Sequence, residues 1–191
     1  LSEGHPYDVS TNIFERLPQI FFDEKPCDGK DYIRILGRMD NARIMKFVRR
    51  DYIREVENLN GYKVFMASAN SNGVFGEILT PPIVAEPCVG NTETFISIGN
   101  FSSLYEADAA RKYIITKFVR ALLGVLKTTH HLTPETWKFV PQQDFSEASD
   151  IDWSRSVEEL DAFLYKKYKL TDAEICFINE KVQAMKDTYN N

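Results

Sequence analysis

Positively charged side chains gather in two stretches of the 191-residue sequence. Residues 30–54 hold eight Lys or Arg against three Asp, and residues 111–138 hold six Lys or Arg against one Glu. Cationic groups at this density can neutralise phosphates, and an Arg side chain can also donate two hydrogen bonds to a guanine edge. The same runs also fit ordinary solvated faces, with the first run paired to Asp31, Asp40 and Asp51.

The first basic stretch has the pattern of two strands joined by a turn. DYIRILGR (31–38) and RIMKFVRR (43–50) alternate apolar and polar residues, and Asp40-Asn41 between them suits a tight turn. The side chains that we expect to contact an anionic partner from this hairpin are Arg34, Arg38, Arg43 and Lys46.

A polar loop, SANSNGVFGE (68–77), follows the strand-like segment GYKVFMAS (61–68). Its short polar side chains carry donors and acceptors that suit base edges, and an exposed Phe could wedge against a base. The candidates for base contact are Ser68, Asn70, Asn72 and Phe75. The alternative is a connecting loop whose Phe75 packs into the core beneath it.

The second basic stretch lies on a helical pattern at residues 103–127, which begins at Ser102 or Ser103 with Glu106 as capping partner. Apolar residues recur at helical spacing on one face. The candidates for phosphate contact lie on another face of this helix and just after its end. They are Lys117, Arg120 and Lys127 on the helix and Thr128 and His130 after it. Alternatively, these cations only complement the dipole of the helix.

Further strands are predicted at 83–87, 92–99 and within 136–145. Ser156 with Glu159 and Thr171 with Glu174 form two capping boxes before short amphipathic segments. The sequence therefore predicts an α+β fold: a β-rich core of short, mostly antiparallel strands, one long helix at 103–127, and a C-terminal helical hairpin. We expect two parts, residues 1–145 as the binding domain and residues 150–191 as a helical appendage.

Charge and cysteine usage narrow the class of protein. All of the net charge of −5 comes from residues 141–191, which hold 11 acidic and 6 basic residues. The three cysteines, Cys27, Cys88 and Cys176, are far apart and form no metal-binding pair, which favours a reducing compartment. No apolar run reaches the length of a membrane span. We therefore expect a cytoplasmic protein without a membrane partner.

Motifs that would carry catalysis are missing from the sequence. It contains neither GxGxxG nor GxxxxGK[ST], and no acidic pair has the spacing of a metal-dependent nuclease. Thr80-Pro81-Pro82-Ile83 lacks the polar first residue and aromatic fourth residue of the amino-methyltransferase motif. For this chain itself we therefore predict no catalytic residue, no cofactor and no metal site.

Several segments, in order along the chain, resemble the C-terminal region of adenine-specific DNA methyltransferases from type II restriction-modification systems. The longest is TETFISIGNFSSLYEADAARKYIITKFVRALLGVLKTT (92–129). The other segments are HPYDVSTNIF (5–14), GYKVFMASANSNGVFGE (61–77), FVPQQDF (139–145) and DIDWSRSVEELDAFLYKKYKLTDAEICFI (150–178).

In that family the catalytic part lies upstream and carries the S-adenosylmethionine pocket, whereas this region selects the DNA sequence. The resemblance therefore implies a bacterial target-recognition domain that binds double-stranded DNA beside an upstream methyltransferase domain, which flips and methylates the adenine. It leaves open whether the whole protein also cleaves DNA. The rival hypothesis is a protein-docking domain of the same enzyme, in which the acidic helical hairpin contacts another domain.

Overall fold

The computed structural model describes residues 9–69, 74–126 and 134–187, and its sheets arise from the alternating segments of the sequence. The first sheet contains, in spatial order, β1 (Phe21–Phe22), β3 (Ala42–Arg49), β2 (Tyr32–Met39) and β6 (Val89–Asn91). The second contains β5 (Ile83–Ala85), β4 (Tyr62–Ala67) and β7 (Phe95–Phe101). All pairings in the described residues are antiparallel except that of β2 with β6.

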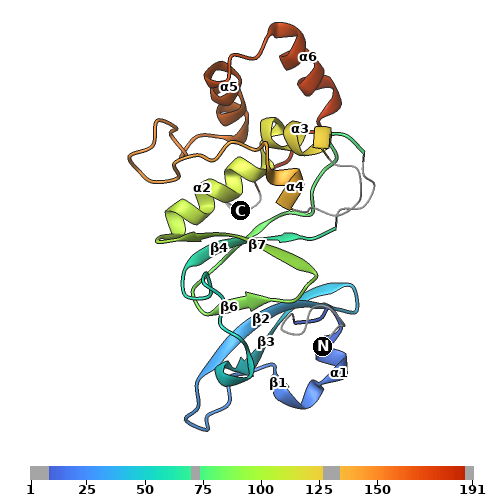
Figure 1. Cartoon of the computed structure of the whole chain (residues 1–191), viewed down its shortest axis with the longest axis vertical. Helices are drawn as coiled ribbons and strands as arrows, with labels where there is room; N and C mark the ends of the chain where they lie inside the picture. The colour runs from blue at the N-terminus through green and yellow to red at the C-terminus, as the bar shows by residue number, and fades with distance from the viewer. Residues whose placement is uncertain (1–8, 70–73, 127–133, 188–191) are drawn as a thin grey trace.

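All the α-helices of the described residues except α1 follow the last strand in the sequence, and they lie on the far side of the second sheet from the first (Figure 1). They are α1 (Ile13–Arg16), α2 (Leu104–Ile115), α3 (Lys117–Leu126), α4 (Pro134–Trp137), α5 (Val157–Lys167) and α6 (Asp172–Lys181). Figure 1 shows an elongated molecule with the first sheet at one end, the second sheet in the middle and the α5–α6 pair at the other end. The predicted α+β class with a C-terminal helical pair is confirmed.

The prediction of one long helix at 103–127 is wrong, because the helix breaks at Thr116. The backbone of Thr116 is extended (φ −59°, ψ 150°), and its hydroxyl accepts from the Val119 N–H at 3.2 Å. The Asp161 carboxylate accepts from the N–H groups of Lys117 and Phe118 at 3.0 and 2.9 Å. A new helix, α3, therefore starts there, with its free N–H groups capped from α5.

The strand predicted within residues 136–145 is also wrong. Trp137 ends the short helix α4, and the chain then runs without regular structure to Asp144. Pro141 has no N–H for a strand ladder, and its carbonyl oxygen accepts from the Tyr113 hydroxyl at 2.8 Å. The segment therefore fastens to α2 instead of joining a sheet.

Two large hydrophobic clusters lie at opposite ends of the molecule. One covers the first sheet and includes Phe14, Ile33 and Val48. The other joins α2, α3, α5 and α6 around Trp153 and Leu160. The C-terminal helices thus complete the core that α2 and α3 begin, while the division into 1–145 and 150–191 stays a prediction.

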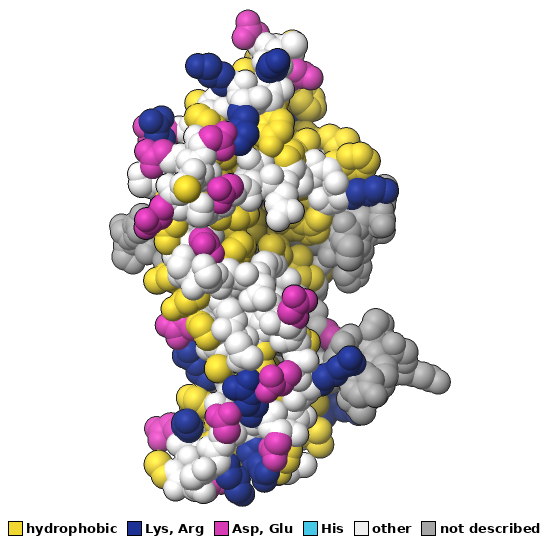
Figure 2. Space-filling model, turned by 60° about the vertical axis from the view of Figure 1, so that its left-hand side comes forward, with side chains coloured by type: hydrophobic (Ala, Val, Ile, Leu, Met, Phe, Trp, Pro, Cys, Tyr) yellow, Lys and Arg dark blue, Asp and Glu magenta, His cyan; other side chains and the backbone are white. Residues whose placement is uncertain are grey.

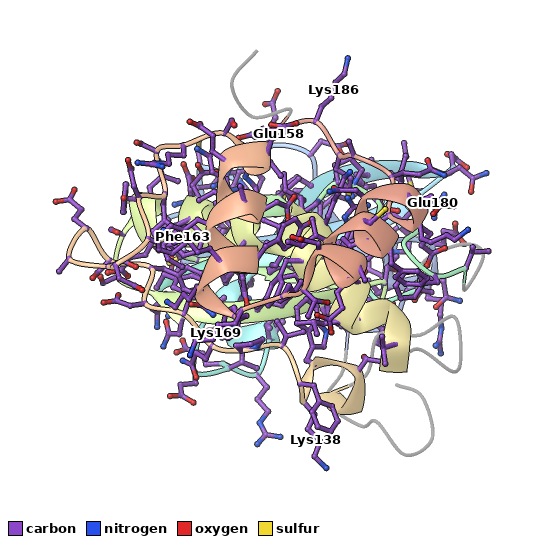
Figure 3. The ribbon with its side chains drawn as sticks, turned by 90° about the horizontal axis from the view of Figure 1, so that it is seen from above. Lys138, Glu158, Phe163, Lys169, Glu180 and Lys186 are labelled. Atoms are coloured by element: carbon purple, nitrogen blue, oxygen red, sulfur yellow. The ribbon has the colours of Figure 1, made fainter. Side chains whose placement is uncertain are left out.

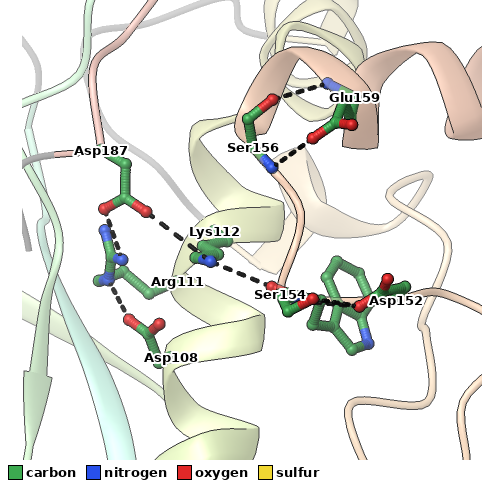
Figure 4. Close-up of polar contacts among 9 residues, drawn as sticks. Asp108, Arg111, Lys112, Asp152, Ser154, Ser156, Glu159 and Asp187 are labelled. Atoms are coloured by element: carbon green, nitrogen blue, oxygen red, sulfur yellow. Dashed lines mark hydrogen bonds and ion pairs between the residues drawn. The ribbon is translucent and has the colours of Figure 1, made fainter. Parts of the chain in front are cut away.

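Polar contacts fix the last described segment onto α2 (Figure 4). Arg111 donates to Asp108 at 2.6 Å and to Asp187 at 2.7 Å. Lys112 donates to the carbonyl oxygen of Trp153 at 3.0 Å. Arg111 and Lys112 are therefore interior residues of the fold, although both lie in the second basic stretch of the sequence.

Lys63 of β4 is the buried cation of the middle layer, with 1% of its surface exposed. Its ammonium donates to the carbonyl oxygens of Asn58, Leu59 and Gly61 at 3.0, 2.9 and 2.9 Å. These three acceptors use all three ammonium protons, and so the lysine holds the turn before β4 closed. Burial lowers the pKa of Lys63 to about 8.

This lowered pKa makes stability depend on pH in the alkaline range. The unfolded chain, with an ordinary lysine pKa of 10.5, binds more protons than the folded chain between pH 8 and 10.5. Stability from this group is therefore present above pH 10.5 and lost as the pH falls through about 8. We expect the unfolding free energy of the wild type, minus that of Lys63→Met, to increase as the pH is raised from about 8 to 10.5. Urea denaturation curves recorded at several pH values would measure this difference. A difference that stays constant would contradict the lowered pKa.

Candidate nucleic-acid interface

The register of the β2–β3 hairpin decides which basic side chains share a face. Residues that lie directly opposite each other in an antiparallel pair point to the same side. Arg34 lies opposite Phe47 and Arg38 lies opposite Arg43, so Arg34, Arg38 and Arg43 are on one face. Lys46 lies opposite Ile35 and so projects on the other face, away from these three arginines.

A tight turn brings the two strands together at this end. Asp40 and Asn41 both have positive φ, at 50° and 62°, as the two central residues of a type I′ hairpin turn require. The predicted turn at Asp40-Asn41 is confirmed, and it places Arg38 and Arg43 two residues from it on either strand.

Several cations of the hairpin are paired with carboxylates. Arg34 contacts Glu86 and Lys46 contacts Asp23, each at 2.7 Å. Arg49 pairs with Asp51. Pairing of this kind is what the alternative of a solvated sheet face predicts, and Figure 2 shows Lys and Arg interleaved with Asp and Glu over the end of the molecule that the first sheet forms. These exposed pairs stabilise the fold only slightly.

Arg38 and Arg43 differ from their neighbours, and we call them the arginine pair. Arg38 donates to the amide oxygen of Asn41 at 3.4 Å, and Arg43 donates to the carbonyl oxygen of Pro81 at 2.8 Å. Among the described residues, neither guanidinium has a carboxylate partner. Both side chains are exposed, which leaves them accessible to an anion from solution.

The two charges of the arginine pair also act on each other. The Arg43 side chain is exposed as a whole, but partial desolvation by its neighbours, and then the charge of Arg38, lowers its pKa. Like charges directly opposite in a sheet repel, and an anion placed between them would relieve that repulsion. The ring of Phe95 lies 5.7 Å from the Arg43 guanidinium and helps to hold it. Sequence reasoning missed both Phe95 and the Pro81 carbonyl, because each is distant from Arg43 in the chain.

The loop at 68–77 is anchored to the protein at both described ends. Ser68 donates from its hydroxyl to the carbonyl oxygen of Thr94 at 3.0 Å. Phe75 packs against Phe177, with ring centroids 5.4 Å apart, and a Cβ added to Gly124 would lie 2.8 Å from the Phe75 ring. Phe75 is therefore half-buried and packs as the alternative predicts, while its contact with a base stays a prediction. Asn70 and Asn72 lie outside the described residues.

The predicted phosphate contact at Arg120 is wrong, because Arg120 is only 2% exposed. Its guanidinium donates to the carbonyl oxygens of Ile115 and Glu77 at 3.2 and 3.3 Å, and to that of Gln183. Burial lowers the pKa of Arg120 to about 10, so the group stays charged at neutral pH. The prediction places Lys117 and Arg120 on one face of a single straight helix, and the break at Thr116 removes that premise.

Lys117 alone among the described cations of α3 reaches the surface, where its ammonium donates to the amide oxygen of Asn179 at 3.0 Å. Lys127, Thr128 and His130 lie outside the described residues. The structure thus brings Arg34, Arg38 and Arg43 onto one face of the hairpin, and it separates them from Lys46, on the other face, and from Lys117, on α3.

Comparisons of the chain with known protein families, with curated proteins and with solved structures found no match. In the described ranges, no helix combines the length and apolar character needed to cross a membrane. Nor do three His, Cys, Asp or Glu side chains in those ranges come together as metal ligands would.

Proposed function

We propose that this chain binds double-stranded DNA, with the β2–β3 hairpin as its contact element. The observation that carries the proposal is the arginine pair: two exposed guanidinium groups on one face of the hairpin tip, without a carboxylate partner among the described residues. This tip is two-stranded, because β6 pairs with β2 only at residues 34–36 and β1 pairs with β3 only at residues 47–48. A two-stranded ribbon fits the major groove, and each Arg can contact a phosphate or a guanine edge.

The wider setting of this proposal rests on the resemblance of the sequence to target-recognition regions. In that setting the chain selects the DNA sequence for an adenine-specific methyltransferase whose catalytic domain and S-adenosylmethionine site lie upstream. Arg34 would reach DNA from the same face once Glu86, its partner at 2.7 Å, exchanges for a phosphate. Contacts to the phosphate backbone of the DNA would position the duplex, whereas contacts to base edges would select the sequence.

The experiment is a fluorescence anisotropy titration of a random-sequence duplex at several salt concentrations. We expect wild-type affinity to fall as salt rises. The double variant Arg38→Ala/Arg43→Ala should bind at least about tenfold more weakly at low salt, and its log–log salt slope should be shallower by about 2 because two contacts are lost. Both residues are exposed, so the fold should persist.

A matched control removes two positive charges elsewhere. Arg155→Ala/Lys186→Ala has the same net charge as the double variant, and both side chains are exposed and lie outside the β2–β3 hairpin. If this control loses as much affinity as the arginine-pair variant, binding follows net charge and the assignment to the hairpin is wrong. If the wild type does not bind at low salt, the proposal fails for this chain.

A second candidate function is docking to another protein domain, favoured by an exposed apolar groove between α3 and α6. Val125 is 73% exposed and Phe177 is 48% exposed, and both line this groove of about 450 Å³. Exposed clusters of this kind mark interaction surfaces. Binding to a purified methyltransferase domain that Val125→Ser/Phe177→Ser abolishes, with no affinity for DNA, would favour docking over DNA recognition.

A further inference from the structure

The two guanidinium groups of the arginine pair are held to different degrees. Arg43 donates from Nη2 to the carbonyl oxygen of Pro81 at 2.8 Å, and the centre of the Phe95 ring lies 5.7 Å from its guanidinium carbon. Arg38 donates to the amide oxygen of Asn41 at 3.4 Å, which is longer than most hydrogen bonds of this kind. Asn41 belongs to the hairpin turn itself. Arg38 is therefore held loosely and only by the hairpin, whereas Arg43 is also attached to another part of the molecule.

Both anchors of Arg43 belong to the second sheet or to the chain that enters it. Phe95 is the first residue of β7, is 6% exposed, and packs in one cluster with Leu36 of the hairpin. Pro81 lies two residues before β5. Its own ring limits its φ and the following Pro82 limits its ψ, so its carbonyl oxygen has a restricted direction. The Arg43 guanidinium is therefore oriented before a ligand binds, and it loses little conformational freedom on binding.

The contact with Pro81 leaves the Arg43 guanidinium able to recognise a base edge. An arginine carries five N–H groups in a planar fork, and the Pro81 carbonyl oxygen takes one of the two on Nη2. Whichever of the two it takes, one edge of the guanidinium keeps two parallel N–H groups, either those of Nε and Nη2 or those of Nη1 and Nη2. Guanine presents O6 and N7 in the major groove as two acceptors that match such an edge. Arg43 is exposed, so a base can reach it from solution.

We propose that Arg43 recognises a guanine in the major groove, while Arg38 contacts a phosphate of the same duplex. This inference rests on the proposed binding of DNA by the β2–β3 hairpin, and it adds which base the hairpin selects. A guanidinium with a fixed direction accepts two hydrogen bonds' worth of acceptors only where a base edge places them, which gives specificity. A loosely held arginine can follow a phosphate, and such a contact positions the duplex without reading its sequence. The two residues lie directly opposite each other in the hairpin, so one duplex can contact both.

The test first selects, from a random-sequence library, the duplexes that the wild-type chain prefers, and then measures affinities by fluorescence anisotropy. We expect the selected duplexes to share a guanine. Arg43→Lys keeps the charge but lacks the planar fork. It should bind a selected duplex at least about tenfold more weakly than the wild type does, and a random-sequence duplex about as tightly. Arg38→Lys is the same change at the opposite position, and it should stay within about threefold of the wild type on both duplexes, because an ammonium also binds phosphate.

Two further measurements isolate the base contact. Replacing the shared guanine by 7-deazaguanine removes N7 and keeps the base pair. It should weaken wild-type binding by about 3- to 10-fold and should not weaken the binding of Arg43→Lys further. Lys169→Asn removes a charge just past the end of α5, on the helical end of the molecule that Figure 3 views from above, and should leave the guanine preference unchanged. Asparagine suits the left-handed backbone of that position, where φ is 54°.

The alternative is that Arg43 only fastens the hairpin to the second sheet. In that case Arg43→Lys lowers the melting temperature and weakens the binding of selected and random duplexes alike, and the inference is wrong. Selected duplexes without a shared guanine, or a guanine preference that Arg43→Lys retains, would also overturn it. Each of these outcomes leaves the proposed function standing as long as the wild type binds random-sequence duplex. If the wild type binds no duplex at low salt, the proposed function and this inference fail together.

Discussion

Replacing Arg120 with methionine is expected to lower the free energy of unfolding by about 3–5 kcal/mol, measured from urea denaturation curves. The methionine fills similar space but leaves three carbonyl oxygens without their donor, that of Ile115 in a buried bond and those of Glu77 and Gln183 in partly buried bonds. Each unsatisfied buried acceptor costs about 1–3 kcal/mol, partly recovered by relaxation. Such a loss is a large share of the stability of an ordinary domain.

The matched control for this variant is Arg155→Met. Arg155 is exposed, and its carboxylate partner among the described residues is Asp152 three residues earlier, so its loss should change stability by less than about 0.5 kcal/mol. An equal loss of unfolding free energy in the two variants would show that the carbonyl oxygens of Ile115, Glu77 and Gln183 do not depend on Arg120. If Arg120→Met weakens DNA binding, it should do so only in proportion to the unfolded fraction.

Asp161→Ala is expected to destabilise the chain by about 2–4 kcal/mol. The carboxylate accepts from two N–H groups at the start of α3, and removing it leaves both without an acceptor in a largely buried place. Urea denaturation of Asp161→Ala and Asp161→Asn should give a graded loss, since the amide oxygen of asparagine can still accept one of the two bonds.

Asp172→Ala is the control for the removal of the Asp161 carboxylate from the start of α3. Asp172 lies in the first turn of α6 and is exposed, and its helix is already capped by Thr171 and Glu174. It should therefore change stability by less than about 0.5 kcal/mol. Should Asp161→Ala unfold at the same urea concentration as this control, the hydroxyl of Thr116 alone would suffice to start α3.

Local patterns in the sequence predicted the local structure well. The Asp40-Asn41 turn and the capping boxes at Ser156 and Thr171 form as expected, because each depends on residues within one turn of the chain. Strand alternation likewise predicted the β2–β3 hairpin. Its register then places Arg38 opposite Arg43, which is why this part of the candidate interface could be anticipated from sequence alone.

Contacts between distant segments defeated the same reasoning. The break between α2 and α3 depends on Asp161, more than forty residues beyond Thr116 in the chain. An arginine on a helix is usually exposed to solvent, yet Arg120 lies in the interior, where it donates to the carbonyl oxygens of Glu77 and Gln183. The spacing of a charged residue in the sequence predicts the helix face on which it lies. It does not predict which carbonyl oxygens a distant segment will place beside it.

The attachments of residues 183–187 bear on how the chain folds as it is synthesised. Asp187 is joined to Arg111 across 76 residues, and the Gln183 carbonyl oxygen completes the set of acceptors around Arg120. The first sheet, by contrast, takes all its described strands from residues 21–91. It can therefore form while translation continues, whereas α2 and α3 expose an incomplete core until the ribosome has released the segment that closes it.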